Sequence, residues 1–180
     1  MHKAVILDRD GTLNRDDGYV HKVEHLEFLP GVKEGLKKLS KDFIFIIITN
    51  QSGIGSGIYM EKDMHKFNDK LVNELKKDGV EIKKVYYCPH KSEHNCSCRK
   101  PEVENAMLAK KEFKIDLKNS WVIGDHLSDV ELGIRVGSRT VYMLTGHGKN
   151  HIEELKKMKI KPDFVADNFL QATDFILSNK

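Results

Sequence analysis

The 180-residue sequence lacks both a long apolar run and a strong excess of charge of either sign. Its longest uninterrupted apolar run, residues 43–48, is far shorter than the roughly 20 residues that a membrane-spanning helix needs. The first residues carry charges where a secretory signal is apolar, so we expect a cytoplasmic protein without a membrane partner. The 30 basic and 27 acidic side chains leave a net charge of only +3, dispersed along the chain, which argues against a nucleic-acid partner.

Proline is scarce as well, and no stretch of the chain resembles a linker between domains. The four prolines and 13 glycines do not cluster, and no internal repeat or low-complexity tract is present. The composition, with 39% apolar and 32% charged residues, is typical of a folded core and not of disorder. We therefore expect one domain over residues 1–180 and, since no oligomer interface is recognisable, a monomer.

Short, almost continuous apolar runs alternate with helical patterns along the whole chain. The runs cover residues 4–7, 43–48, 85–87, 121–123, 140–143 and 164–166. The helical patterns have apolar side chains three or four residues apart, as in Met64, Phe67, Leu71 and Leu75; Val103, Ala106 and Met107; Leu127, Val130 and Ile134; and Phe169, Ala172 and Ile176. Continuous apolar strands are typical of a sheet covered on both faces. The pattern predicts an α/β fold of three layers, with a doubly wound, mainly parallel sheet.

Polar residues follow three of these runs at the point where each strand is expected to end. Asp8 and Asp10 follow the first run, Thr49 follows the second, and Asp125 and Asp129 follow the fourth. In a doubly wound sheet, ligands bind beyond the carboxyl ends of the strands, so these side chains are expected to meet. Several carboxylates in one place favour a hard cation such as Mg²⁺, which also binds substrate phosphate.

The three cysteines lie within eleven residues of one another, and no other cysteine is present. Cys88, Cys96 and Cys98, with one histidine, make up the donor set of a closed structural zinc site. His90 and His94 are both available as the fourth ligand. Because residues 88–101 are too polar to form a core of their own, we expect zinc to order this loop.

Taken together, these motifs resemble those of the haloacid dehalogenase-type phosphatase superfamily. The shared residues are Asp8-x-Asp10-Gly11-Thr12, then Thr49, then a basic residue, then Gly124-Asp125-x-x-x-Asp129. The strings DRDGTLN, GYVH, FLPGV, TNQSGI and CPH…CxCRKP resemble one branch, the D-glycero-D-manno-heptose-1,7-bisphosphate phosphatases and the similar histidinol phosphatases. This resemblance covers residues 4–144. It implies a phosphatase that removes the C7 phosphate of a phosphorylated sugar, with histidinol phosphate as the alternative substrate. A non-catalytic binding protein organised by zinc is the alternative from another class.

The resemblance also implies a role for each motif residue. Asp8 would attack phosphorus and form an aspartyl-phosphate, while Asp10 would act as general acid and then general base. Asp8, the backbone carbonyl of Asp10 and Asp125 would bind Mg²⁺, with Asp129 orienting this shell. Thr49 would stabilise the transition state.

The cysteine loop would supply the cations of the site. Arg99 and Lys100 directly follow the last cysteine, so zinc would hold them over the phosphate, and Lys100 would pair with the carboxylate of Asp8. The resemblance favours His90 over His94 as zinc ligand.

No insertion in the sequence is long enough to form a large cap domain, so a small, open pocket is expected. Its substrate-binding residues are predicted to be Arg99 and Lys100 together with Asn14, His21, Asn50, Gln51 and Ser52. One departure from the family pattern is His126, which stands where a lysine is usual and adds a group that is able to be neutral at pH 7. The histidines at positions 2, 25, 65, 147 and 151 show no ligand spacing and are expected at the surface.

Overall fold

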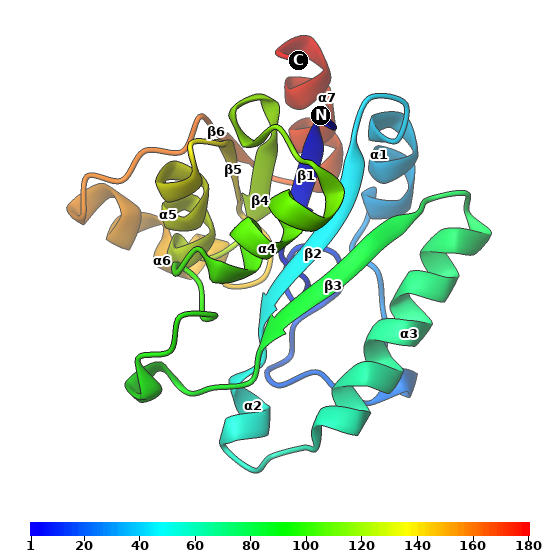
Figure 1. The fold of residues 1–180 in the computed structure, drawn as a ribbon, viewed down its shortest axis with the longest axis vertical. Helices are drawn as coiled ribbons and strands as arrows, with labels where there is room; N and C mark the ends of the chain where they lie inside the picture. The colour runs from blue at the N-terminus through cyan, green and yellow to red at the C-terminus, as the bar shows by residue number, and fades with distance from the viewer.

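The computed structural model describes residues 1–180, and six parallel strands form its single sheet (Figure 1). The strands are β1 (Ala4–Leu7), β2 (Ile44–Asn50), β3 (Ile82–Cys88), β4 (Trp121–Gly124), β5 (Arg139–Met143) and β6 (Phe164–Ala166). Their order in the sheet is β3-β2-β1-β4-β5-β6, and every neighbouring pair is parallel. The predicted α/β fold with a doubly wound sheet is confirmed. Each predicted apolar run coincides with one strand, although the run 85–87 covers less than half of β3.

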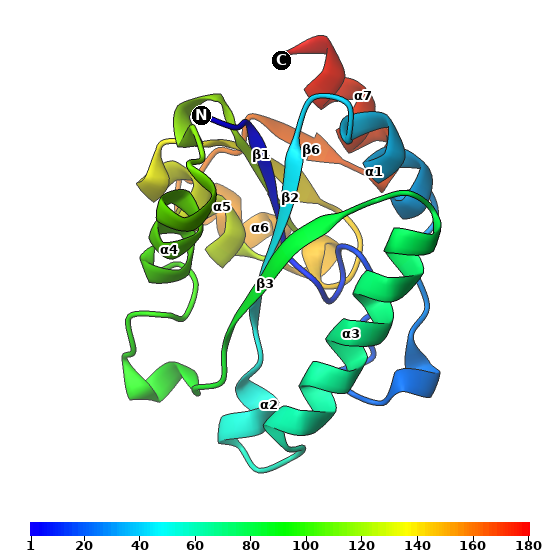
Figure 2. The same cartoon turned by 45° about the vertical axis from the view of Figure 1, so that its right-hand side comes forward.

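Helices cover both faces of this sheet and give the molecule three layers. The helices are α1 (Val32–Leu39), α2 (Ser52–Gly55), α3 (Glu61–Lys77), α4 (Glu104–Phe113), α5 (Leu127–Val136), α6 (Gly148–Lys157) and α7 (Phe169–Ser178). Figures 1 and 2 show α1, α3 and α7 on one side of the sheet and α4, α5 and α6 on the other. The short helix α2 lies beyond the end of β2 instead of on a face.

The side chains of β1 contribute to two hydrophobic cores, one on each face of the sheet. Val5 and Leu7 pack in the larger cluster with α1, α3 and α7, whereas Ala4 and Ile6 pack in the cluster with α4 and α5. Successive side chains of a strand point to opposite faces, so a strand buried on both faces must be apolar throughout. This requirement explains why β1 has no polar residue before Asp8.

Two of the predicted helical stripes are wrong in part. Met107 of α4 and Ile134 of α5 are 45% and 52% exposed, although their spacing from other apolar residues is helical. In α4 the buried stripe consists of Ala106 and Ala109, and in α5 the buried Gly133 faces Thr140 of β5. Small residues let both helices approach the sheet closely, so larger apolar residues at the margins of the stripes point outward.

The two longest connections end at the same edge of the sheet. Residues 8–31 and 89–103 each contain only a single 3₁₀ turn, Val23–His25 and Ser92–His94. No cap domain therefore covers the carboxyl ends of the strands, as expected from the sequence. No helix is both long and apolar enough to cross a membrane.

Candidate active site

A cleft of about 630 Å³ opens at the carboxyl ends of β1, β2 and β4. β1 lies between β2 and β4, with Leu7 in register with Ile47 on one side and Ile123 on the other. Residues that follow these strands therefore converge, as the sequence predicts. The predicted site residues that line the cleft are Asp8, Asp10, Thr49, Asn50, Gln51, Ser52, Arg99, Lys100, Asp125 and Asp129.

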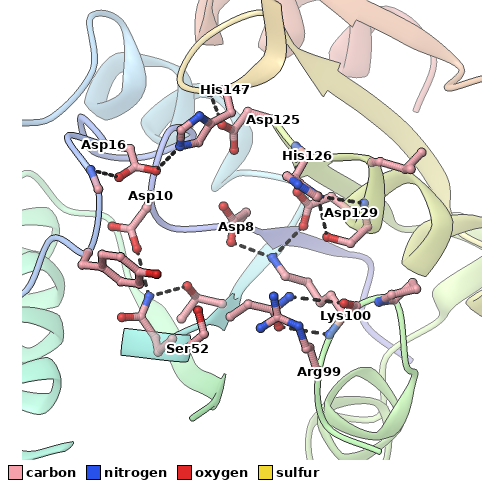
Figure 3. Close-up of a pocket in the computed structure, with 18 of the residues that line it drawn as sticks. Asp8, Asp10, Asp16, Ser52, Arg99, Lys100, Asp125, His126, Asp129 and His147 are labelled. Atoms are coloured by element: carbon pink, nitrogen blue, oxygen red, sulfur yellow. Dashed lines mark hydrogen bonds and ion pairs between the residues drawn. The ribbon is translucent and has the colours of Figure 1, made fainter. Parts of the chain in front are cut away.

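Three buried carboxylates form the centre of the cleft (Figure 3). Asp8, Asp125 and Asp129 each place one carboxylate oxygen within 4.8 Å of the others. Burial, together with the neighbouring carboxylates, raises the pKa of Asp8 to about 7 and that of Asp125 to about 8. Crowded, desolvated carboxylates favour either protonation or a bound cation. Oxygen donors in this arrangement fit a hard divalent ion.

Lys100 supplies one positive charge to this group from the cysteine loop. Its Nζ lies 2.6 Å from Asp8 Oδ1 and 2.6 Å from Asp129 Oδ1, and the residue is only 5% exposed. Burial lowers the pKa of Lys100, but the two carboxylates outweigh this effect and raise it above its ordinary range. Asn50 holds the backbone of Lys100, accepting a hydrogen bond from its N–H and donating one to its carbonyl. The lysine is therefore fixed as a cation between Asp8 and Asp129.

Asp125 is enclosed by backbone from two other loops. A Cβ added at Gly11, whose φ is +77°, would lie 2.3 Å from Asp125 Oδ2. The same oxygen accepts a hydrogen bond from the backbone N–H of His147 at 2.8 Å, and the Thr12 hydroxyl donates to the other at 3.3 Å. A side chain at position 11 would occupy the space of this carboxylate, so glycine is required there.

The carboxylate of Asp10 lies at the edge of the cleft, where it accepts four hydrogen bonds. Arg9 donates from Nε and Nη2, Asn14 donates from Nδ2, and Gln51 donates from Nε2. Gln51 Nε2 also donates to the hydroxyl of the buried Thr49. Asp10, Gln51 and Thr49 therefore form one hydrogen-bonded group.

Two residues predicted to bind substrate do not line the cleft. Asn14 is fully buried behind Asp10, and its amide donates to Asp10 and to the Arg15 carbonyl. His21 stacks on Tyr59, with ring centroids 4.5 Å apart, and lines a separate groove beside Ile58. The spacing of polar residues in a loop does not reveal which of them turn inward, and here packing determines it.

His147 is a cleft residue that the sequence did not reveal. Its side chain is 51% exposed, as expected for a surface histidine, but its Nε2 lies 3.1 Å from Asp16 Oδ2 at the rim of the cleft (Figure 3). Asp16 also accepts a hydrogen bond from the Gly18 N–H. The connection after β1 and the loop after β5 therefore meet at this rim. The motif TGHG gives no spacing signal for such a contact.

The cysteine loop brings three sulfur atoms and one imidazole nitrogen together. Cys88 Sγ lies 3.4 Å from Cys96 Sγ, which lies 3.5 Å from Cys98 Sγ. His90 Nδ1 lies 3.3 Å from Cys98 Sγ and 3.7 Å from Cys88 Sγ. Tetrahedral zinc with bonds of about 2.3 Å to sulfur separates its ligand atoms by a little under 4 Å, so these donors fit that ion. His94 is not among these four ligands.

Comparisons with known proteins agree with this geometry. A HAD-hydrolase-like family model matches residues 97–172. The chain is 39% identical to D-glycero-alpha-D-manno-heptose-1,7-bisphosphate 7-phosphatase of Campylobacter jejuni, over 87% of this chain and 92% of that protein. It is 38% identical to D-glycero-beta-D-manno-heptose-1,7-bisphosphate 7-phosphatase of Haemophilus influenzae, over 83% of this chain and 88% of the relative. The chain belongs to the HAD-like phosphatases, in the heptose-bisphosphate phosphatase branch.

A solved structure of this branch shares the fold throughout. D,D-heptose 1,7-bisphosphate phosphatase from B. bronchiseptica, crystallised with magnesium and phosphate, superposes with a TM-score of 0.88 at 26% identity. The superposition covers 99% of both chains. The protein is therefore a phosphatase of the HAD-like type, and magnesium in that neighbour supports Mg²⁺ as its cofactor.

His126 lines the cleft next to Asp125. It precedes α5, and its Nδ1 accepts a hydrogen bond from the Ser128 N–H at 3.3 Å. Burial lowers the pKa of His126 below its ordinary value, so the imidazole is neutral at pH 7. The residue next to Asp125 in sequence is thus a neutral imidazole.

Proposed function

We propose that this phosphatase removes the C7 phosphate of D-glycero-D-manno-heptose 1,7-bisphosphate through an aspartyl-phosphate on Asp8. The observation that carries the proposal is the position of Asp8, whose carboxylate lies in an open cleft against Lys100 and two further carboxylates. The names of its relatives, both alpha and beta 7-phosphatases, support the heptose bisphosphate as substrate. The cleft of about 630 Å³ is large enough for a phosphorylated sugar.

In the first step, an oxygen of Asp8 attacks the C7 phosphorus, and the bond between phosphorus and the sugar oxygen breaks. Asp10 gives its proton to that oxygen, so that the sugar leaves as an alcohol. In the second step, Asp10 takes a proton from water, and the resulting hydroxide attacks the phosphorus. The bond to Asp8 then breaks, inorganic phosphate forms, and the free carboxylate of Asp8 is restored.

Lys100 and Thr49 would stabilise the charge that develops on the phosphoryl oxygens. Lys100 is already fixed beside Asp8 by Asn50 and Asp129, so little reorganisation is needed during the reaction. Arg99 also lines the cleft, and its guanidinium makes one hydrogen bond within the protein, to the His90 carbonyl at 3.3 Å. Its guanidinium therefore has donors available for an anionic group of the substrate.

Asp8, Asp125 and the backbone carbonyl of Asp10 would hold Mg²⁺. The fit rests on the carboxylate oxygens within 4.8 Å of one another and on the raised pKa values of Asp8 and Asp125, since a single lysine leaves their charge uncompensated. Asp129 is hydrogen-bonded to Lys100 and to the His126 N–H, so it would orient this shell instead of binding the ion directly. Bound Mg²⁺ would offset the charge between the carboxylates and the phosphate.

Cys88, His90, Cys96 and Cys98 would bind zinc and order the cysteine loop. The loop has no apolar cluster of its own, and its last ligand is directly followed by Arg99 and Lys100. A metal cross-link is a way to fix a polar segment that packing does not fix. Zinc would therefore act on catalysis through the position of the two cations.

The test compares phosphate release from heptose 1,7-bisphosphate, fructose 1,6-bisphosphate and histidinol phosphate, with Mg²⁺ and zinc present. We expect the highest kcat/KM with the heptose bisphosphate, and a loss of activity in Asp8→Asn, which keeps the shape of the side chain. Higher activity with histidinol phosphate would refute the substrate. No release from any of the three would favour a binding protein over an enzyme.

A further inference from the structure

Arg9 is a fully buried arginine that stands between the two aspartates of the first motif and does not line the cleft. Its guanidinium donates a hydrogen bond to Asn68 Oδ1 at 2.9 Å, to the Val20 carbonyl at 2.7 Å and to Gln51 Oε1 at 3.1 Å. Its carbon Cζ also lies 4.6 Å from the centre of the Phe67 ring. A buried guanidinium is tolerated only when it is paired, and here its hydrogen-bond partners Val20, Gln51 and Asn68 come from three separate segments of the chain.

Nε and Nη2 of Arg9 form a fork on the carboxylate of Asp10, and Nη2 is shared with the oxygens of Val20 and Gln51. Nε donates to Oδ1 at 2.9 Å, and Nη2 donates to Oδ2 at 2.6 Å. Asn14 Nδ2 gives Oδ1 a second hydrogen bond, and Gln51 Nε2 gives one to Oδ2, both at 2.9 Å. Each carboxylate oxygen therefore accepts two hydrogen bonds, which is the number of its lone pairs. This arrangement leaves the Asp10 side chain one orientation at the cleft edge.

The four donors are not equivalent when a substrate arrives. Asp10 must present one oxygen to the leaving group, so one of its hydrogen bonds has to be replaced. Arg9 carries a full positive charge and donates two parallel hydrogen bonds to the carboxylate, whereas Asn14 and Gln51 each donate one from a neutral amide, so either amide is displaced more readily than the fork of Arg9. The fork keeps its geometry because Arg9 is itself anchored by Asn68 of α3 and by Gln51 after β2.

We propose that Arg9 is a positioning residue for Asp10: its buried guanidinium aims the Asp10 carboxyl group at the oxygen of the leaving group. The proposal rests on the proposed role of Asp10 as general acid and base. The orientation of the Asp10 carboxyl group then depends on residues outside the cleft. Arg9 contacts Asp10 directly, and Asn68 holds Arg9 in place. The proposal adds no chemical step, because the proton still passes from Asp10 to the leaving oxygen.

The test compares two substrates that differ in their need for a general acid. Cleavage of an alkyl phosphate such as heptose 1,7-bisphosphate releases the sugar through an alkoxide oxygen, which needs a proton. Cleavage of p-nitrophenyl phosphate releases a phenolate that is stable without one. For Arg9→Lys, which keeps the charge but not the fork, we expect kcat/KM on the heptose bisphosphate to fall about 100-fold. On p-nitrophenyl phosphate we expect kcat/KM to fall less than about tenfold, because this parameter reports formation of the aspartyl-phosphate and not the later hydrolysis, in which Asp10 serves both substrates as general base.

Asn68→Ala serves as a second variant if Arg9→Lys does not fold. It removes one anchor of Arg9 without touching Asp10, and we expect the same selective loss at a smaller size, about fivefold. Thr140→Val is the control for destabilisation alone, since Thr140 is buried on β5 and its hydroxyl donates to Asp163, away from the cleft. Its activities on the two substrates are expected to change by the same factor.

Equal losses on both substrates in Arg9→Lys and in Asn68→Ala would overturn the proposal, because Arg9 would then have only a structural role. Asp10→Asn separates this failure from that of the proposed function. If Asp10→Asn is selective for the alkyl phosphate and the Arg9 and Asn68 variants are not, Asp10 keeps its role and Arg9 loses its own. If Asp10→Asn is not selective either, the acid role of Asp10 and the proposal for Arg9 both fail.

Discussion

Without magnesium, the protein is expected to lose folding stability as the pH rises from about 5 to about 7. Burial raises the pKa of Asp8 to about 7 and that of Asp125 to about 8, whereas carboxyl groups of an unfolded chain titrate near 4. Between those values the unfolded chain has released protons that the folded protein retains. The stabilisation that these groups give is therefore complete at low pH and is lost as the pH rises through their folded pKa values.

The expected size of the effect follows from the width of this pH window. One carboxyl group that is protonated only in the folded protein reduces the free energy of unfolding by about 1.4 kcal/mol per pH unit. Asp8 alone therefore accounts for about 2–3 kcal/mol between pH 5 and pH 7. Added Mg²⁺ should restore stability mainly at the higher pH, where the carboxylates are charged and able to bind it.

The assay is urea unfolding followed by circular dichroism at about pH 5, 6 and 7, after dialysis into buffer with and without Mg²⁺. Dialysis is preferable to a strong chelator because a chelator would also remove the zinc that the cysteine loop is proposed to bind. Asp125→Asn is the control, since it removes one buried carboxyl group and lowers the pKa of Asp8 by removing a nearby negative charge. The reasoning is refuted if wild type and Asp125→Asn show the same pH dependence in the absence of Mg²⁺.

Three further predictions concern the groups around the carboxylates. Lys100→Met should lower kcat by at least about 100-fold in Mg²⁺, because Asp8 loses the cation 2.6 Å from it; retained activity would exclude this role. Removal of zinc by a zinc-selective chelator, with Mg²⁺ in excess, should lower both activity and the melting temperature, and unchanged turnover by folded, zinc-free protein would contradict the link between zinc and the position of Arg99 and Lys100. Gly11→Ala should destabilise the protein by about 1–3 kcal/mol more than Gly57→Ala, measured by urea unfolding. Both glycines have positive φ, but only the methyl group at position 11 meets Asp125, so equal losses would exclude the steric argument.

The strands were predictable because a sheet covered on both faces requires strands that are apolar at every position. Residues 4–7 are apolar without interruption, and β1 has the same bounds. The helices were less predictable at their margins. Met107 has the spacing of a buried stripe but points outward, because the small side chain of Ala106 brings α4 close to the sheet. Spacing identifies a helix, whereas the depth at which it packs depends on the partner surface.

The candidate site also combines features that were predictable from the sequence with features that depend on packing. The convergence of Asp8 and Asp125 was predictable, since both follow parallel strands that flank one another. The inward turn of Asn14, the stacking of His21 on Tyr59 and the burial of Arg9 were not. Arg9 depends on Asn68, which is 59 residues further along the chain. A hydrogen bond over that separation leaves no local pattern in a single sequence.

The open edge of the sheet has a consequence for the rate of turnover. Because the connections after β1 and β3 form only a rim, substrate and water reach Asp8 without the opening of a hinged lid. Enzymes that close over their substrates are often limited by that motion or by product release. Here a phosphoryl group on Asp8 would face the open cleft, where water, at its high concentration, outcompetes any second sugar as phosphoryl acceptor.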